Sequence, residues 1–108
     1  MAFVACDANA RLLTVDLNSW QVIATKTVGQ DPDVLAYDQS AHRLYVAAES
    51  GTVTVADLHG HQLVVTGSDH LADGAHVVAV DPTTHHSFFP IPADTNGHPA
   101  LLEQQPDT

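Results

Sequence analysis

Apolar residues fall in short runs separated by turn residues, which is the pattern of strands rather than helices. Runs rich in Val, Ile and Thr alternate with Gly, Pro, Asn, Asp and Ser, and no stretch keeps helical spacing. The strand starts lie about ten residues apart, which indicates antiparallel hairpins, because parallel pairing needs longer crossovers. The pattern predicts ten strands: Ala2 to Cys6, Arg11 to Asp16, Gln21 to Val28, Val34 to Asp38, Arg43 to Ala48, Thr52 to Asp57, Gln62 to Thr66, His76 to Asp81, His86 to Phe89, and Ala100 to Gln104.

The chain repeats itself at intervals of 41 to 43 residues. A shift of 43 places VLAYDQSAHRLYV over VVAVDPTTHHSFF, so that Asp38 lies over Asp81 and His42 over His85. A shift of 42 places LYVAAE over AFVACD, and a shift of 41 places VTVADL over LTVDL. A period of this length that holds four strands is typical of one blade of a β-propeller.

The polarity of the strands in the middle repeat favours a propeller over a β-sandwich. Val34 to Tyr37 and Leu44 to Ala48 are apolar at every position, whereas Thr52 to Val55 alternates. A sandwich strand alternates because one face of each sheet meets water, but both faces of a propeller blade pack against neighbours. We therefore predict an all-β fold of antiparallel four-stranded propeller blades, with about two and a half blades present. Residues 1–33 are expected to hold the last three strands of one blade, 34–75 a complete blade, and 76–108 the first three strands of another with a tail.

The run GQDPDVLAYDQSAHRLYVAAESGTVTVADLHGHQLVVT resembles the YVTN type of β-propeller repeat. In that repeat a strand ends in Asp before a turn, an aromatic-Val pair lies on the next strand, and a Val-rich strand ending in Asp-Leu follows. The resemblance extends from Ala2 to about Glu103, with departures at Phe88-Phe89-Pro90 and at Glu49, where Asn is common. It implies the C-terminal blades of a longer propeller, and a bacterial periplasmic or cell-surface location.

The number of blades has a physical consequence. Propellers close with about 4 to 8 blades, and stacked repeats need about three neighbours to bury a continuous core. We expect this chain to belong to a longer propeller; the alternative is that several copies close a ring together. The expected partners are the remaining blades or further copies, together with an unidentified protein or small-molecule ligand.

Charge excludes several other partners. The formal net charge is −10, and no Lys or Arg follows Arg43. Nucleic acid and anionic membrane surfaces are repelled, because the cations that neutralise phosphates are missing. No run of about 18 apolar residues occurs, so membrane insertion is not expected. Cys6 is the single cysteine. The segment from Phe3 to Cys6 loosely suggests a lipoprotein cleavage site, but it lacks the upstream segments of a signal peptide.

Four aspartates recur at the ends of predicted strands. Calcium needs six to eight oxygens in one place, whereas the repeat distributes these carboxylates over different turns. An aspartate that accepts hydrogen bonds from the following turn explains the pattern without a metal. We predict this role for Asp16, Asp38, Asp57 and Asp81.

Histidine pairs suggest a zinc site, but a structural zinc site needs four ligands and no matching set accompanies them. We predict surface or loop positions for His59, His61, His85 and His86, and a turn role for His42 and His85, which are equivalent in the repeat. No metal and no other cofactor is expected.

The remaining candidates for chemistry have structural explanations. The serines Ser19, Ser40, Ser50, Ser68 and Ser87 lack an elbow motif such as G-x-S-x-G. Glu49 and Glu103 are interpreted as solvent-facing residues beside turns, and Trp20 and Tyr37 as packing residues. No catalytic residue is predicted.

Two functions remain open. The first is a non-catalytic propeller module that serves as a scaffold or a recognition surface. The second is a piece of a propeller enzyme of the lactonase-like or amine-dehydrogenase-like type, with a site assembled from blades missing here. An enzyme requires the loops before the innermost strands, Gln30 to Asp33 and Asp69 to His76, to direct charged groups toward the axis of the ring.

Overall fold

A computed structural model describes residues 1–106 of the chain. These residues form ten strands and one short 3₁₀ helix, η1 (Asp7–Asn9). All ten strands expected from the sequence are present within residues 1–106. The strands are β1 (Ala2–Cys6), β2 (Arg11–Asp16), β3 (Gln21–Thr27), β4 (Pro32–Asp38), β5 (Arg43–Ala48), β6 (Thr52–His59), β7 (Gln62–His70), β8 (Ala79–Val80), β9 (Ser87–Ile91) and β10 (Ala100–Gln104).

Six strands differ from their predicted bounds. Four of them differ by one or two residues at one or both ends: β3 ends at Thr27, β4 begins at Pro32, β6 ends at His59, and β9 spans Ser87–Ile91. β7 and β8 differ more. β7 continues to His70 instead of ending at Thr66, because Thr52 to Val55 of β6 remain paired with it. β8 contains only Ala79 and Val80, although a strand from His76 to Asp81 was predicted. The register of the pair places Val77 opposite Pro90, which has no backbone N–H to donate, so the ladder ends there.

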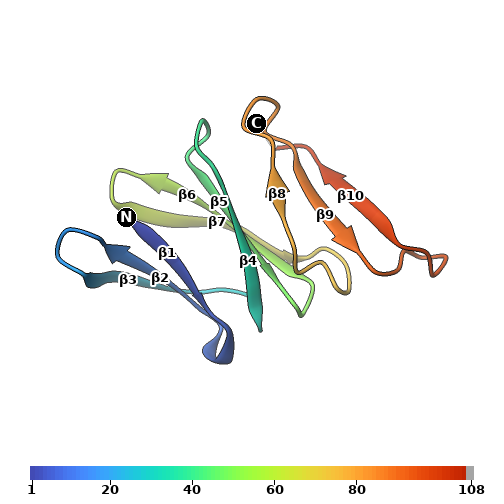
Figure 1. The fold of residues 1–108 in the computed structure, drawn as a ribbon, viewed down its shortest axis with the longest axis horizontal. Coiled ribbons are helices and arrows are strands. Elements are labelled where there is room, and N and C mark those ends of the chain that lie inside the picture. Colours follow the sequence, from blue (N-terminus) through green and yellow to red (C-terminus); the bar gives the residue numbers. More distant parts are fainter. Residues whose placement is uncertain (107–108) are drawn as a thin grey trace.

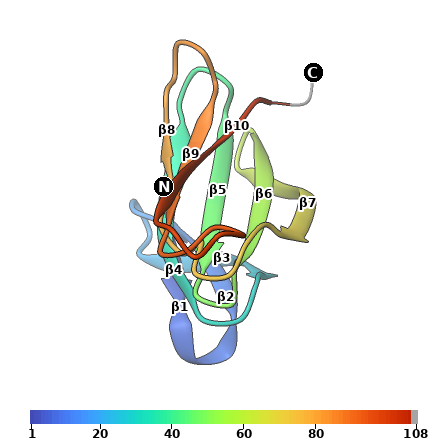
Figure 2. The same cartoon turned by 90° about the vertical axis from the view of Figure 1, so that its right-hand side faces the viewer.

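The strands form three antiparallel sheets in chain order within residues 1–106 (Figure 1). The first sheet has the order β1-β2-β3, the middle sheet β4-β5-β6-β7, and the third sheet β10-β9-β8. Viewed from the side, the third sheet lies in front of the middle one (Figure 2). The all-β, antiparallel fold predicted from the sequence is confirmed, and its sheets have the form of propeller blades.

The first and middle sheets enclose one hydrophobic cluster. Leu12 and Val28 meet Leu44 and Val46 of β5, and Leu63 of β7 completes the contact. Phe3 and Tyr37 pack against this cluster, with ring centroids 6.0 Å apart. Tyr37 is therefore a packing residue, as predicted.

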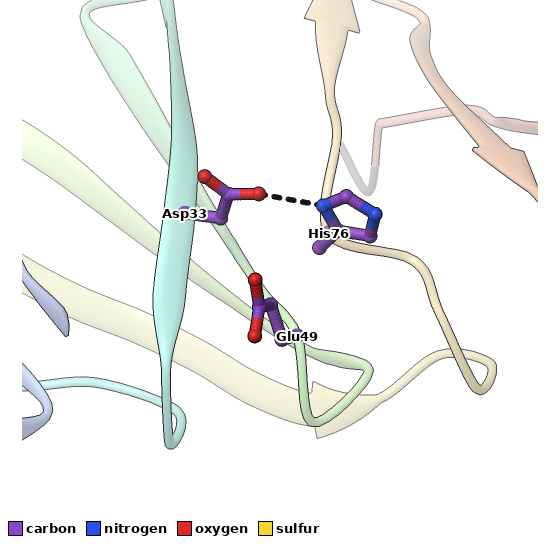
Figure 3. Close-up of side chains that lie close together, drawn as sticks. All are labelled: Asp33, Glu49 and His76. Carbon is purple, nitrogen blue, oxygen red and sulfur yellow. Dashed lines mark hydrogen bonds and ion pairs between the residues drawn. The ribbon is translucent and has the colours of Figure 1, made fainter. Parts of the chain in front are cut away.

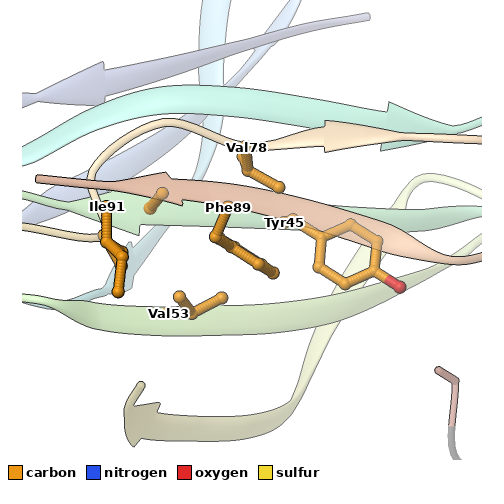
Figure 4. Packing of buried hydrophobic residues seen from close by; sticks show 7 residues of the cluster. Tyr45, Val53, Val78, Phe89 and Ile91 are labelled. Carbon is orange, nitrogen blue, oxygen red and sulfur yellow. The ribbon is translucent and has the colours of Figure 1, made fainter. Parts of the chain in front are cut away.

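The middle and third sheets enclose a second cluster, with the Phe89 ring at its centre (Figure 4). Tyr45 and Val53 approach this ring from the middle sheet, and Val78 and Ile91 lie on the side of the third sheet. Because Leu44 and Val46 face one neighbour while Tyr45 and Ala47 face the other, β5 is buried on both sides, as the polarity of its sequence predicted.

Burial decreases from β5 toward the edge of the middle sheet. Every residue from Leu44 to Ala48 is buried, whereas β7 is exposed apart from Leu63 and the half-buried Gly67. Trp20, predicted to pack, is 78% exposed instead. It occupies the turn between β2 and β3 with φ 58°, and this left-handed backbone directs the indole away from both clusters.

No helix within residues 1–106 combines the length and apolar character that crossing a membrane requires.

Candidate functional site

Asp33, Glu49 and His76 meet where the middle and third sheets lie side by side (Figure 3). Their ligand atoms all lie within 4.8 Å of one another, and this is the one such group among residues 1–106. His76 Nδ1 donates a hydrogen bond of 2.6 Å to Asp33 Oδ2. Both carboxylates are exposed and the imidazole is half-buried, so water and solutes reach the group.

A β-bulge positions Asp33. The register of β4 against β5 shifts between Pro32 and Val34, which leaves Asp33 as the extra residue. Bulges of this kind redirect a side chain and are frequent beside active sites. The bulge turns the Asp33 carboxylate toward the segment that leads into β8 (Figure 3).

Glycine at position 51 allows the other two residues to approach. Gly51 has φ 87°, and a Cβ there would lie 2.3 Å from the carbonyl oxygen of Ala72. The β5–β6 turn that carries Glu49 therefore packs directly against the β7–β8 connection that carries His76. The N–H of Leu71 donates to the Gly51 carbonyl oxygen at 2.9 Å and fixes this contact.

Two kinds of chemistry are available to this group. The Asp33 carboxylate orients the imidazole through Nδ1 and leaves Nε2 of His76 available as a general acid or base. Alternatively, one imidazole and two carboxylates match the three protein ligands of an open divalent metal site, such as catalytic zinc. Two carboxylates supply fewer oxygens than the six to eight that calcium takes.

Asp38, Ser40 and His85 form a second polar group, between the turns β4–β5 and β8–β9. His85 Nδ1 donates to Asp38 Oδ2 at 2.6 Å, and the Ser40 hydroxyl lies 2.6 Å from the carbonyl oxygen of Pro82. A hydrolytic triad places its acid and its serine on different ring nitrogens, but here both approach Nδ1. This group therefore joins two sheets and has no triad geometry.

The electrostatics of Asp38 agree with a structural role. Burial acts to raise the pKa of this fully buried carboxyl, but hydrogen bonds from His85, Ala41 and Ser40 outweigh it and hold the pKa below its usual value.

Asp38 caps the β4–β5 turn, as predicted, because its Oδ1 accepts hydrogen bonds of 3.1 Å from the backbone N–H of Ser40 and of Ala41. Asp16 and Asp81 cap their turns in the same way, as predicted. Their Oδ1 atoms accept hydrogen bonds of 2.8 Å from the backbone N–H of Asn18 and of Thr83. These bonds from the turn lower the pKa of both carboxyls. Asp57 differs from the prediction, because it pairs with the Arg43 guanidinium across β5 and β6 at 2.8 Å.

The histidines singled out in the sequence take separate positions. His59 and His61 are exposed at the β6–β7 turn, and His86 Nδ1 lies 2.7 Å from Glu103 Oε1. His42 and His85 both have positive φ, 55° and 63°, which confirms their predicted turn role.

The sequence analysis did not predict that Asp33, Glu49 and His76 lie close together. Glu49 is exposed beside a turn, as predicted, but its proximity to the other two was missed. Asp33 and His76 are 43 residues apart, which is the repeat period, so equivalent positions in neighbouring repeats lie side by side. The 43-residue spacing was therefore the feature of the sequence that could have predicted the contact between Asp33 and His76.

Comparisons with known proteins support the fold. No family model matches the chain, and no curated protein matches it. Among solved structures, hydrazine synthase of Kuenenia stuttgartiensis, a β-propeller-containing enzyme, is similar with a TM-score of 0.69 and 19% identity. The match covers 82% of this chain and 25% of that one, so this chain spans about a quarter of its neighbour's length. At this identity, the similarity shows a propeller-type fold alone.

Proposed function

We propose that the chain is a non-catalytic β-propeller repeat module of the YVTN type. It forms part of a larger ring, which is completed by further blades or further copies, and serves as a scaffold or recognition surface for a protein or small-molecule ligand. The main support for this proposal is a difference in how the faces of the middle sheet and of the two end sheets are covered. Among residues 1–106, the middle sheet is covered on both faces by apolar contacts, whereas each end sheet is covered on one face only.

The uncovered faces are apolar. On the first sheet, Val4 lies opposite Leu13 in the register and is 43% exposed. On the third sheet, Leu101 lies opposite Pro90 and is 64% exposed. Exposed apolar side chains on an uncovered sheet face are typical of interaction sites, because water contact with them is unfavourable.

The mass of the purified chain in solution tests the proposal. We expect light scattering to report species larger than the 11.5 kDa chain. The double variant Val4→Glu, Leu101→Glu should shift the population toward monomer, whereas the control Gln62→Glu, on exposed β7, should not. A stable wild-type monomer with a cooperative melt would contradict the proposal.

A second function, a piece of a propeller enzyme of the lactonase-like or amine-dehydrogenase-like type, is favoured by the Asp33–His76 pair. An imidazole oriented by a carboxylate in an accessible position is a general acid–base arrangement. Hydrolysis of a simple lactone by the wild-type chain, compared with Asp33→Asn and His76→Ala, discriminates the two functions. Turnover lost in both variants would favour the enzyme, and equal background rates would favour the module.

A further inference from the structure

A hollow of about 440 Å³ lies between the outer strands of the middle sheet and the third sheet. Val53 and Val55 of β6 and Gly67 of β7 line one side, and Phe89 and Gln104 line the other. The volume falls within the range of about 300–1,000 Å³ that is typical of ligand pockets. Its lining is continuous with the hydrophobic cluster around Phe89.

The corresponding place between the first and middle sheets is filled. There β7, the fourth strand of the middle sheet, inserts Leu63 beside Leu12, and Leu63 is 1% exposed. Within residues 1–106 the third sheet has three strands, and β10 is its outer edge. The hollow is therefore the place where a fourth strand of the third sheet would insert its side chain.

A glycine of β7 lines the hollow. Gly67 lies opposite Val55 in the β6–β7 register, and a Cβ at this position would meet nothing within 4 Å. Glycine inside a strand often marks a place where another backbone approaches closely. Unpaired N–H and C=O groups along the edge of β10 offer hydrogen bonds to such a backbone.

The chain itself contains a matching strand. β3 is the outer edge of the first sheet, and it exposes Val22 by 54% and Ile23 by 45%. It also carries Lys26, the one lysine of the chain, which is half-buried opposite Leu12. The surface around β10 is complementary to this cation, because Glu103 and Asp69 are exposed and no Lys or Arg follows Arg43.

From these observations we propose that β3 of a second copy pairs with the edge of β10 and places Val22 or Ile23 in the hollow. This contact joins unlike surfaces, so it is heterologous, and copies associate head to tail. The inference rests on the proposed function and specifies which edges of the module meet.

A mixing experiment with two blocked variants tests the inference. Gly67→Phe fills the hollow and leaves β3 intact, and the open space around Gly67 allows the fold to accept the ring. The double variant Val22→Asp, Ile23→Asp blocks β3 and leaves the hollow intact. Ile23 is the extra residue of a β-bulge against β2, so both residues are changed together, and whichever of them would enter the hollow carries a charge.

We expect each blocked variant alone to associate at least tenfold more weakly than wild type in sedimentation velocity. An equimolar mixture of the two variants should form a heterodimer, because one variant keeps an intact β3 and the other keeps an intact hollow. The control Val65→Phe, an exposed residue on β7 that does not line the hollow, should associate like wild type. Circular dichroism of each variant establishes that it is folded.

Three results would overturn the inference. They are wild-type association of Gly67→Phe, a mixture that does not combine, and equal weakening by Val65→Phe. If wild type associates but the mixture does not, the proposed function stands and only the β3–β10 contact is wrong. A wild-type chain that is monomeric contradicts both.

Discussion

His85 Nδ1 lies 2.6 Å from Asp38 Oδ2, although the two residues are 47 positions apart and belong to different sheets. Asp38 and Asp81, which occupies the same place one repeat later, both accept hydrogen bonds from their own turns. Asp38 is fully buried and bonds His85 in addition, whereas Asp81 is half-buried. The contact therefore ties the turn of one sheet to the turn of the next.

The buried Asp38 makes the free energy of unfolding depend on pH in the acid range. Its pKa is lower in the folded state than in the unfolded chain, so its contribution is present above the unfolded value of about 3.9 and is lost as the pH falls through the folded value. We expect Asp38→Asn to lower the melting temperature at pH 7 and the difference from wild type to shrink below pH 4. Thermal melts from pH 7 to pH 2.5 measure this, and a constant difference would contradict it.

An unpartnered hydroxyl offers a stabilising substitution. Thr14 Oγ1 is buried without a hydrogen-bond partner, and Thr14 lies opposite Ala24 across β2 and β3. In the middle sheet Thr54 lies opposite Ser68, and their hydroxyls are 3.1 Å apart. Ala24→Ser should supply the missing partner and raise the free energy of unfolding by about 1 kcal/mol in urea titration. Ala24→Val, which adds volume without a hydroxyl, is the control and should give no such gain.

Val53 tests the cluster around Phe89. It is 9% exposed and packs in that cluster, so Val53→Asp buries a charge without a partner. We expect loss of the cooperative melt, because a cost of several kcal/mol is comparable to the stability of a small domain. Val65→Asp, at a residue 40% exposed, is the matched control and should melt like wild type. An unchanged melt of Val53→Asp would remove Val53 from the core.

Gly51 and Gly97 form a matched pair for the close approach at the candidate site. Both have positive φ, 87° and 77°, so alanine at either position has a similar backbone cost of about 1–2 kcal/mol. A Cβ at Gly51 collides with the Ala72 carbonyl, whereas one at Gly97 meets nothing within 4 Å. Gly51→Ala should therefore be the more destabilising by at least about 1 kcal/mol. Equal unfolding free energies for Gly51→Ala and Gly97→Ala would show that the β7–β8 connection does not pack closely against the β5–β6 turn.

The strands could be predicted because their signal is local. β1, β2, β5 and β10 have the predicted bounds, since their apolar runs end at turn residues. β8 is shorter than predicted, and its end depends on Pro90 of the strand it pairs with. Trp20 was misjudged because its exposure follows from a left-handed turn that the residue type did not indicate.

The candidate site was less predictable. The segments that carry Asp33 and His76 were recognised as the ones that could direct charge toward the axis of the ring. Their contact was not recognised, because it needs the bulge at Asp33 and the close approach at Gly51. Neither feature is a property of a single strand.

The sequence by itself determined the all-β class, the strand order along the chain and the burial of β5 on both faces. These follow from apolar spacing and from turn residues, which act between near neighbours. Only the tertiary structure decided that Asp33 meets His76, that Asp38 meets His85, and that Gly67 faces a hollow. Contacts between sheets depend on twist, bulges and the side chains of remote segments, and a local pattern does not contain that information.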